Sequence, residues 1–393
     1  WFAGLFGLLA ATLACSSFLK LELDLTLVWL LAAAILLRKQ WQDDDEPIPY
    51  LNEGLLLLII LGGATWFRFS HLGKIPIASS IPDEALLKLK AHFYLNGVRE
   101  TFAMGPGSIQ DGAVPFYLEA LSMKLFGHDL QGFRTLIAMI GVLLCYLIYG
   151  IGKDLLGRRV GLLAAAFTAF SLWTLGISQV NYLMNESLLF VLLCFYATLV
   201  GLRRQSAAWL ALAGFCFGIS FNTYKAMQLV LALLPYLLLL LYVYEPQRRE
   251  SVKKSLAPLL AGAFLGLVPL LLWAYWGGDI AYKAYFSSLS APHIVGVGAV
   301  QSTLLGKMNF LFGRAIDYFP KMLTLFISHG PTLAATFSAT VPLASPALVL
   351  FVLIGLAAGL ARGRRAGSLF LILWFFYGFL PALVAEPTSI PND

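Results

Sequence analysis

The chain has 393 residues, of which 59% are hydrophobic and only 12% are charged, a far more apolar balance than that of a soluble globular domain. This composition excludes a soluble enzyme and indicates a polytopic membrane protein. The net charge of +6 does not indicate nucleic-acid binding here, because basic residues of a membrane protein gather in particular loops and report topology. The four cysteines all lie inside apolar stretches, so they predict neither a disulfide framework nor a metal site.

About eleven apolar stretches follow one another along the chain, several of them near the roughly 20 residues that a helix needs to cross a bilayer. They are residues 2–19, 25–37, 52–67, 133–152, 160–177, 187–202, 207–223, 227–244, 256–276, 342–361 and 367–385. We therefore expect an all-α integral membrane protein, a polytopic helical bundle with about eleven spans.

Fourteen of the 27 Lys and Arg fall in five loops that this arrangement places on one side of the membrane. The loops contain Arg38–Lys39, Lys153–Arg159, Arg203–Arg204, Arg248–Lys254 and Arg362–Arg365. By the positive-inside rule these loops are cytoplasmic, and the intervening connections are extracytoplasmic.

We expect one transmembrane domain over residues 1–393. Residues 1–51 form an N-terminal helical hairpin with an acidic linker at 42–46, which reads as a solvated segment rather than a metal site because it has no neighbouring histidine. Two large extracytoplasmic loops are expected at 68–132 and 277–341; the second contains His293 and His329. The chain begins at Trp1 and ends at Asp393 in what reads as the start of an outside loop, so we expect it to be a fragment whose C-terminal part is missing.

The first of these loops contains the adjacent carboxylates Asp83 and Glu84. Helices are expected near 84–97 and 115–126, separated by a Gly/Pro-rich link, and the first is amphipathic enough to lie along the membrane surface. Asp83 would then sit at the boundary between water and lipid. It can cap the following helix, and it can also act in chemistry, since a capped carboxylate stays ionised and oriented as a general base requires.

Seven short segments follow one another along the chain in an order that is typical of one protein family. They are Pro82–Ala85, Pro115–Leu118, Lys124–Gly127, Phe133–Thr135, Leu155–Ala165, Gly218–Tyr224 and Pro342–Gly359. In this order they resemble the GT-C glycosyltransferases, in particular the group of protein O-mannosyltransferases and aminoarabinose transferases (glycosyltransferase family 39) that use polyprenyl-phosphate sugars. The resemblance covers about 300 residues. It departs from the aminoarabinose-transferase pattern at Leu86 and Val114, where that pattern has an arginine and a lysine, and no Trp-Trp-Asp signature of oligosaccharyltransferases is present.

The resemblance implies extracytoplasmic transfer of a sugar from a lipid phosphate to an acceptor hydroxyl. Asp83 matches the family's base, and Glu84 would position or tune it. Arg134 matches a recurrent arginine whose planar guanidinium can bind phosphate, although an arginine at a helix end can also anchor it at the interface.

Two more turns on the outside carry candidates for binding the substrate or the lipid phosphate. Glu186 matches best the acidic residue that relatives carry after a tyrosine, with Asn185 as the second choice, and its other reading is a favourable charge at a helix N-terminus. Tyr224 and Lys225 occupy the third outside turn, where Lys225 can contact phosphate or snorkel to the interface.

The resulting prediction is a membrane glycosyltransferase, hexosyl- or pentosyl-transferring, in a bacterial plasma membrane with its active site outside. Its partners would be a polyprenyl-phosphate sugar as cosubstrate, a lipid, glycan or protein acceptor, and membrane lipids, with no nucleic acid. No cofactor or metal site is predicted, although a divalent metal is compatible with the sequence. The alternatives are a transporter or lipid flippase, which would need charged or broken helices near the bilayer midplane, and a membrane scaffold without catalysis.

Overall fold

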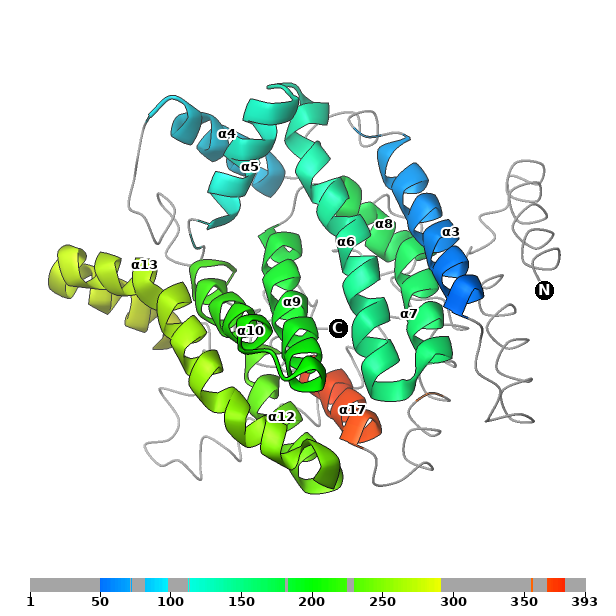
Figure 1. The fold of residues 1–393 in the computed structure, drawn as a ribbon. Helices are drawn as coiled ribbons and strands as arrows, with labels where there is room; N and C mark the ends of the chain where they lie inside the picture. The colour runs from blue at the N-terminus through cyan, green and yellow to red at the C-terminus, as the bar shows by residue number, and fades with distance from the viewer. Residues whose placement is uncertain are drawn as a thin grey trace, which may run out of the picture.

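The structure is a computed structural model that describes residues 50–70, 72, 82–97, 112, 114–180, 183–224, 230–290, 355 and 366–378. The expected N-terminal hairpin, the acidic linker, the span at 342–361 apart from residue 355, and most of the second large loop, with His293 and His329, lie outside these residues. Across the described ranges every regular element is helical, as the composition predicts (Figure 1). The elements are α3 Tyr50–Phe69, α4 Pro82–Leu95, α5 Val114–Phe126, α6 Leu130–Leu156, α7 Arg158–Phe170, α8 Leu172–Gln179, α9 Leu183–Arg204, α10 Ala207–Ile219, η1 Ser220–Asn222, α12 Leu233–Tyr244, η2 Pro246–Arg248, α13 Arg249–Ser290 and α17 Ala366–Gly378.

Three segments of the described chain are long and apolar enough to cross a membrane: Leu130–Leu156, Asn185–Arg204 and Pro246–Leu272. Shorter apolar helices cover Ala207–Asn222, Leu233–Tyr244 and Ala366–Phe375. These segments correspond to predicted spans, while the total of eleven extends beyond the part of the chain that the structure describes.

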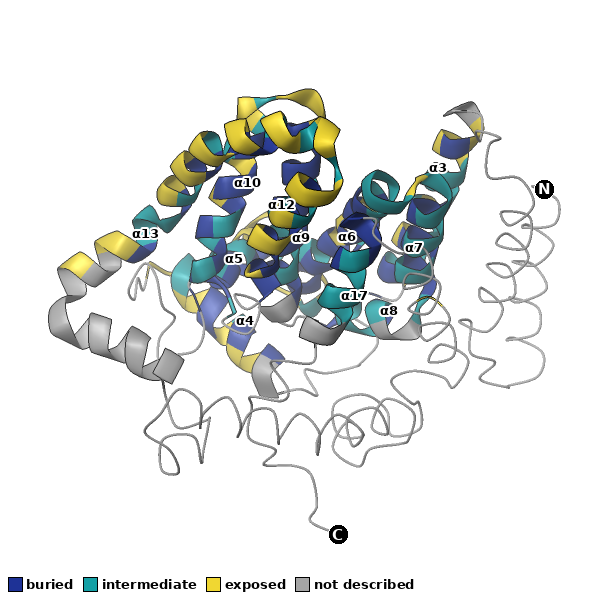
Figure 2. Cartoon of the chain, turned by 90° about the horizontal axis from the view of Figure 1, so that it is seen from below, coloured by how far each residue is buried: buried dark blue, intermediate teal, exposed yellow. Residues whose placement is uncertain are grey.

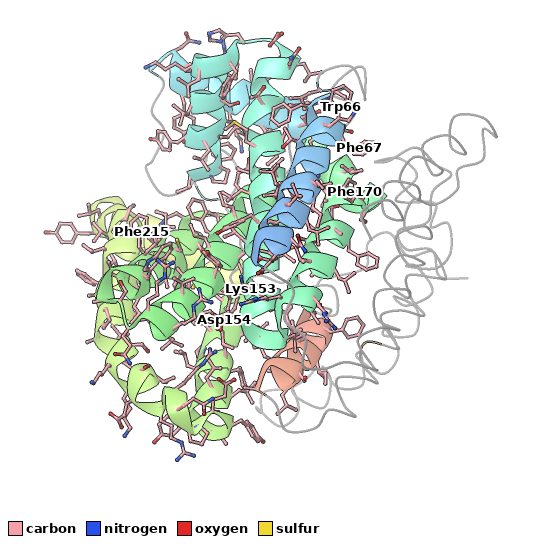
Figure 3. All side chains as sticks on the ribbon, turned by 45° about the vertical axis from the view of Figure 1, so that its right-hand side comes forward. Trp66, Phe67, Lys153, Asp154, Phe170 and Phe215 are labelled. Carbon is pink, nitrogen blue, oxygen red and sulfur yellow. The ribbon has the colours of Figure 1, made fainter. Side chains whose placement is uncertain are left out.

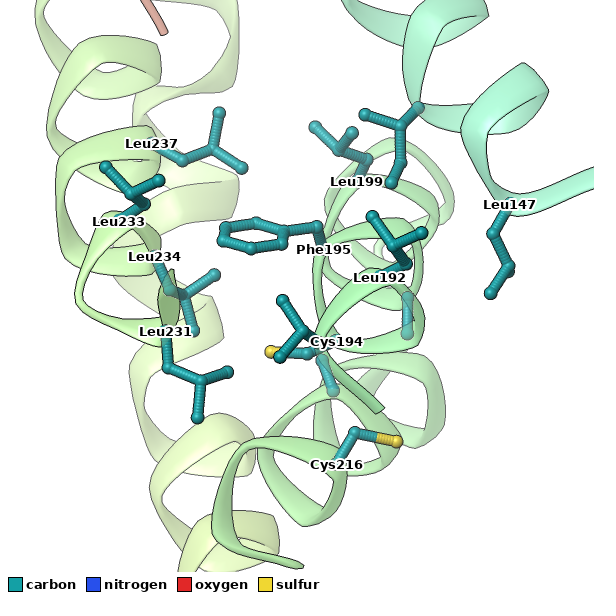
Figure 4. Close-up of a cluster of buried hydrophobic side chains, with 14 of the residues drawn as sticks. Leu147, Leu192, Cys194, Phe195, Leu199, Cys216, Leu231, Leu233, Leu234 and Leu237 are labelled. Atoms are coloured by element: carbon teal, nitrogen blue, oxygen red, sulfur yellow. The ribbon is translucent and has the colours of Figure 1, made fainter. Parts of the chain in front are cut away.

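Helix α6 organises the bundle, since α3, α5, α7, α8, α9 and α17 all contact it. Next to it, α9 lies in the interior, and its buried side chains meet those of α10, α12 and α17. Figure 4 shows the ring of Phe195 pointing from α9 toward Leu233, Leu234 and Leu237 of α12, and Cys194 and Cys216 belong to the same buried cluster. Cys145, Cys194 and Cys216 are therefore core residues, as their apolar surroundings predict, while Cys15 lies outside the described residues.

The outer faces of the bundle are apolar and exposed. Along α13 the exposed side chains include Leu256, Leu260, Phe264 and Leu265, whereas α9 is mostly buried (Figure 2). In a protein with membrane-spanning helices such faces are the surfaces that lipid covers, so their exposure is the expected arrangement.

Helices α10 and α13 approach each other closely through paired glycines. Gly214 and Gly218 of α10 lie four residues apart, as do Gly262 and Gly266 of α13, and a Cβ at any of these positions would overlap a backbone carbonyl oxygen of the other helix. Small residues at this spacing let membrane helices pack backbone against backbone where lipid supplies no hydrophobic driving force.

Two predicted boundaries are wrong. The stretch 160–177 is not one helix but two, α7 and α8, separated at Ser171, whose ψ of 130° is extended. The helix predicted at 256–276 extends from Arg249 to Ser290, because apolarity marks the part of a helix that crosses lipid and not its ends.

The contact between α10 and α13 gives a stability prediction. Gly218→Ala should lower the free energy of unfolding by about 1–3 kcal/mol, because its methyl group must displace the backbone at Ala263. Gly62→Ala in α3 is the matched control: it makes the same chemical change where a Cβ meets nothing within 4 Å. Thermal unfolding in detergent measures both variants, and equal melting temperatures would contradict the close packing.

Candidate functional site

The candidate site is built on the first helix of the predicted extracytoplasmic loop. Helix α4 begins at Pro82, where the fixed φ of proline favours the first position of a helix and its missing N–H costs nothing. Asp83 is therefore the second helical residue and lies inside the first turn, rather than just before the helix as the capping prediction assumed. A carboxylate in a first turn is stabilised by the positive end of the helix dipole.

Glu84 and Arg134 form a buried, two-pronged ion pair between α4 and α6. Nε of Arg134 lies 2.6 Å from Oε1 of Glu84, and its second guanidinium nitrogen donates to Oε2 at 2.7 Å. Both side chains are fully buried, with 0% exposure. The planar guanidinium matches both carboxylate oxygens at once, the strongest geometry available to such a pair.

The helices that carry this ion pair, α4 and α6, also share a small apolar cluster with α5. Six buried residues of α4, α5 and α6 form it: Leu87, Ala91, Phe116, Ala120, Met123 and Phe133. Lys90, 4% exposed, places its ammonium 4.7 Å from the centre of the Phe116 ring, a cation–π contact. The buried face of α4 thus carries two charged residues, and Leu86, Leu89 and Phe93 remain exposed.

The start of α6 is fixed independently. Asp129 caps the helix by accepting the Gly132 N–H at 2.7 Å, and the Ser122 hydroxyl of α5 donates to the Gly132 carbonyl at 2.6 Å. The Asp129 cap and the Ser122 hydrogen bond therefore hold the first turn of α6, which carries Arg134, in place against α5.

A second group of candidates gathers where α9 begins and η1 ends. Glu186 and Asn185 are buried in the first turn of α9, and the Asn185 amide donates to the Ile177 carbonyl at 2.5 Å. The Tyr224 N–H donates to the hydroxyl of Ser187 at 2.9 Å, so the turn before α9 and the turn after η1 meet. Lys225 and Tyr182 lie outside the described residues, and so does the side chain of Asp83.

The first loop reaches this second group through Gly112. Its N–H donates to the Thr223 carbonyl at 3.3 Å, and a Cβ at this position would overlap the backbone of Asn222. A glycine is therefore needed for the close approach. Three segments that are distant in sequence meet here, namely the first loop, the start of α9 and the end of η1.

The structure adds polar residues that the sequence analysis missed. Asn222 is fully buried beside Thr223, and neither polar atom of its amide finds a hydrogen-bond partner among the described residues. One Glu186 oxygen, Oε2, is in the same condition. The signal was present as Asn222-Thr223 at the end of an otherwise apolar stretch, since buried polar groups are costly unless they are satisfied.

The described geometry therefore consists of a buried ion pair at Glu84, the residue after Asp83, and of a separate group of buried polar residues where α9 begins and η1 ends. Among the described residues no three His, Cys, Asp or Glu side chains gather in a way that could hold a metal ion. The ion pair can hold the first turn of α4 in place, and the groups of Asn222 and Glu186 that are unsatisfied within the described chain can offer hydrogen bonds to a polar ligand.

Comparison with known proteins gives a family match over part of the chain and a similar fold over most of it. Residues 111–276 match the family of dolichyl-phosphate-mannose-protein mannosyltransferases. No protein of curated function matches the chain.

Among solved structures, the chain is similar to the archaeal oligosaccharyltransferase AglB from Archaeoglobus fulgidus, solved in complex with an inhibitory peptide and a dolichol-phosphate. The TM-score is 0.54 and the sequence identity is 15%, and the match covers 86% of this chain and 48% of that one. The same organism's oligosaccharyltransferase tethered to an acceptor peptide with an NVT sequon gives a TM-score of 0.53 at 15% identity, over 86% of this chain and 49% of that one. The chain thus spans about half the length of the solved relatives it matches, and at this identity the likeness is one of fold. Residues 111–276 are therefore similar to the mannosyltransferase family, and the chain as a whole shares the fold of an oligosaccharyltransferase, which makes the protein similar to glycosyltransferases of the GT-C type.

Proposed function

We propose that the protein transfers a single sugar from a polyprenyl-phosphate carrier to an acceptor hydroxyl outside the cytoplasm, with Asp83 as general base. The observation that supports this most is the position of Asp83 next to Glu84, whose buried ion pair with Arg134 ties the start of α4 to the start of α6. A base must be held to within a fraction of an ångström, and this anchor is suited to hold the helix turn that carries it.

The proposed reaction needs one acceptor hydroxyl, one sugar on a lipid phosphate and one base. The acceptor oxygen attacks the anomeric carbon, the bond from that carbon to the phosphate oxygen breaks, and the lipid phosphate leaves with the bonding electrons. Asp83 takes the proton of the acceptor hydroxyl as the attack proceeds. Such a base contributes about 10²–10⁴-fold to the rate.

The ion pair gives Arg134 and Glu84 a positioning role in this proposal. The positive charge of Arg134 is compensated by Glu84 at 2.6 Å, so Arg134 is a weaker phosphate ligand than an uncompensated cation would be. We assign the contact with the phosphosugar to Asn185 and Glu186 at the start of α9 and to Tyr224 after η1. Lys225, which follows Tyr224 in the sequence, would supply a cation for the phosphate.

The relatives support a lipid-linked donor. The matched family is described as using dolichyl-phosphate-mannose, and the archaeal oligosaccharyltransferase was solved with a dolichol-phosphate. We propose a polyprenyl phosphate carrying one hexose or pentose, an acceptor that is a lipid, a glycan or a protein, and a bacterial plasma membrane. Transfer of a whole oligosaccharide to asparagine is not proposed, because the chain carries no Trp-Trp-Asp signature.

The first test is sugar transfer by the full-length enzyme in nanodiscs. Asp83→Asn should reduce turnover about 10²–10⁴-fold while donor binding is kept, since the amide preserves the shape but cannot take a proton. Glu250→Gln is the matched control, because that carboxylate is exposed near the start of α13 and pairs only locally with Lys253. Turnover by Asp83→Asn equal to that of the control would overturn the assignment of the base, and absence of transfer by the wild type with every donor would favour a transporter or flippase.

The second test concerns the anchor. Removing one partner, as in Glu84→Gln or Arg134→Gln, should cost about 3–5 kcal/mol of stability, because it breaks a buried, two-pronged ion pair. The double variant Glu84→Leu with Arg134→Met should recover much of this stability, since an apolar pair of similar volume needs no compensation.

Hydrogen exchange of α4 together with the melting temperature in detergent measures these effects. If the two single variants melt like the wild type and α4 stays protected, the ion pair does not anchor α4.

A further inference from the structure

The end of the bundle away from α4 carries a pocket that the proposed transfer reaction does not use. It lies between α6 and α9 and has a volume of about 150 Å³. Its polar lining consists mainly of three tyrosines and three cations, Tyr146, Tyr149, Lys153, Tyr196, Arg203 and Arg204. Figure 3 shows Lys153 and Asp154 at the end of α6 that is distant from α4 and α5. We name this site the basic pocket.

The basic pocket is a built site rather than a chance gathering of loop lysines and arginines. Asp154, whose side chain is 3% exposed, receives hydrogen bonds from Arg203 at 2.9 Å and from Arg248 at 3.0 Å. The same carboxylate thus joins three of the basic loops, on α6, α9 and η2, and holds Arg203 at the pocket wall. An ion pair with two arginines fixes side chains that would otherwise move freely.

Lys153 is held in the same way on the other side of the pocket. Its ammonium lies 2.7 Å from Oε1 of Glu53 and donates to the Tyr149 hydroxyl at 3.0 Å, and that hydroxyl donates in turn to Glu53. An ammonium has three N–H donors, so one donor of Lys153 remains beyond these two contacts.

Other donors of the pocket remain open to a ligand as well. No acidic partner pairs with Arg204 within the described chain, and it follows Arg203 at the last turn of α9. The hydroxyls of Tyr146 and Tyr196 lie 3.2 Å apart and share one hydrogen bond, which leaves one hydroxyl proton to donate elsewhere. With three cations and the single carboxylate of Asp154 in its lining, the pocket has a positive charge.

The backbone supports this arrangement at two points. Gln205 has a φ of 50° and the Ser206 N–H donates to the Gly201 carbonyl at 3.0 Å, so α9 ends in a left-handed turn directly after Arg204. At Gly150 of α6 a Cβ would overlap the ring of Tyr196, so the glycine lets this ring lie against α6 at the pocket.

The surroundings point to a lipid. Tyr196 lies 6.2 Å from Trp209, ring centre to ring centre, and aromatic residues together with Lys and Arg mark the level of the lipid headgroups. Along α6 the exposed side chains Met139, Leu143 and Tyr146 form an apolar strip that runs from the bilayer interior to the pocket. An acyl chain can lie along this strip while its headgroup enters the pocket.

We infer that the basic pocket binds the phosphate of an anionic phospholipid, with Arg204, Lys153 and the tyrosine hydroxyls donating to its oxygens. Basic pockets between membrane helices on the cytoplasmic side are suited to such headgroups, and guanidinium groups match phosphate geometry. The inference does not depend on the proposed reaction, because the site lies at the opposite end of α6 from Arg134.

The test is retention of lipid by the full chain purified in mild detergent, exchanged into equal amounts of phosphatidylglycerol and phosphatidylcholine and examined by native mass spectrometry. We expect preferential retention of phosphatidylglycerol and an approximately fivefold loss of it in Arg204→Gln, the effect of about 1 kcal/mol for one cation at a membrane surface. Lys253→Gln removes a cation at the same end of the bundle but outside the pocket lining, and it should retain the lipid as the wild type does.

Three results would overturn the inference. The first is equal retention of the two lipids by the wild type, and the second is an equal loss in Arg204→Gln and Lys253→Gln. The third is binding of inorganic phosphate to lipid-free protein with complete displacement of phosphatidylglycerol at millimolar phosphate, which would assign the pocket to a soluble anion. The melting temperature of each variant verifies that the fold is kept, since Arg204 has no carboxylate partner among the described residues to lose.

Discussion

The thickness of the bilayer is the constraint on which the rest of the structure depends. Arg134 and Lys153 lie near the two ends of α6, 19 residues apart, which corresponds to about 28 Å along a helix and is close to the thickness of the hydrocarbon core. Each cation is paired with a glutamate from another helix, Glu84 of α4 at one end and Glu53 of α3 at the other. Both ends of α6 are therefore tied to a neighbouring helix by an ion pair, fully buried at Arg134 and partly exposed at Lys153, whose side chain is 31% exposed.

Between these ends the helices meet through shape rather than charge. The glycines of α10 and α13 bring two backbones into contact, and the leucines of α12 pack around Phe195 of α9 (Figure 4). Since lipid is as apolar as leucine, close packing is what holds membrane helices together, and this explains why the lipid-facing side of α13 can remain a plain apolar surface.

The two ends of the helical bundle differ in the side chains that they bring together. The end that carries α4 collects short segments around a rigid anchor, where Gly112, Ser187 and Thr223 bring the first loop, α9 and η1 together. The other end collects cations around Asp154. A phosphosugar on a lipid tail and a phospholipid headgroup both present phosphate at a membrane surface, and the two proposals place one of these ligands at each end of α6.

The sequence by itself determined the helical membrane class, the approximate position of most described helices, and the meeting of the described basic loops at one end. Burying polar groups in lipid is costly, so the segments that cross the bilayer must be continuously apolar and the charged residues must lie in loops. It also pointed to Glu84, Arg134, Asn185, Glu186 and Tyr224, but as separate candidates. Only the tertiary structure decided that Glu84 and Arg134 are partners across 50 residues, that α7 and α8 are separate, and that Tyr224 meets the first turn of α9. Such contacts depend on which faces of packed helices come together, and hydropathy records how apolar a segment is but not which of its neighbours it touches.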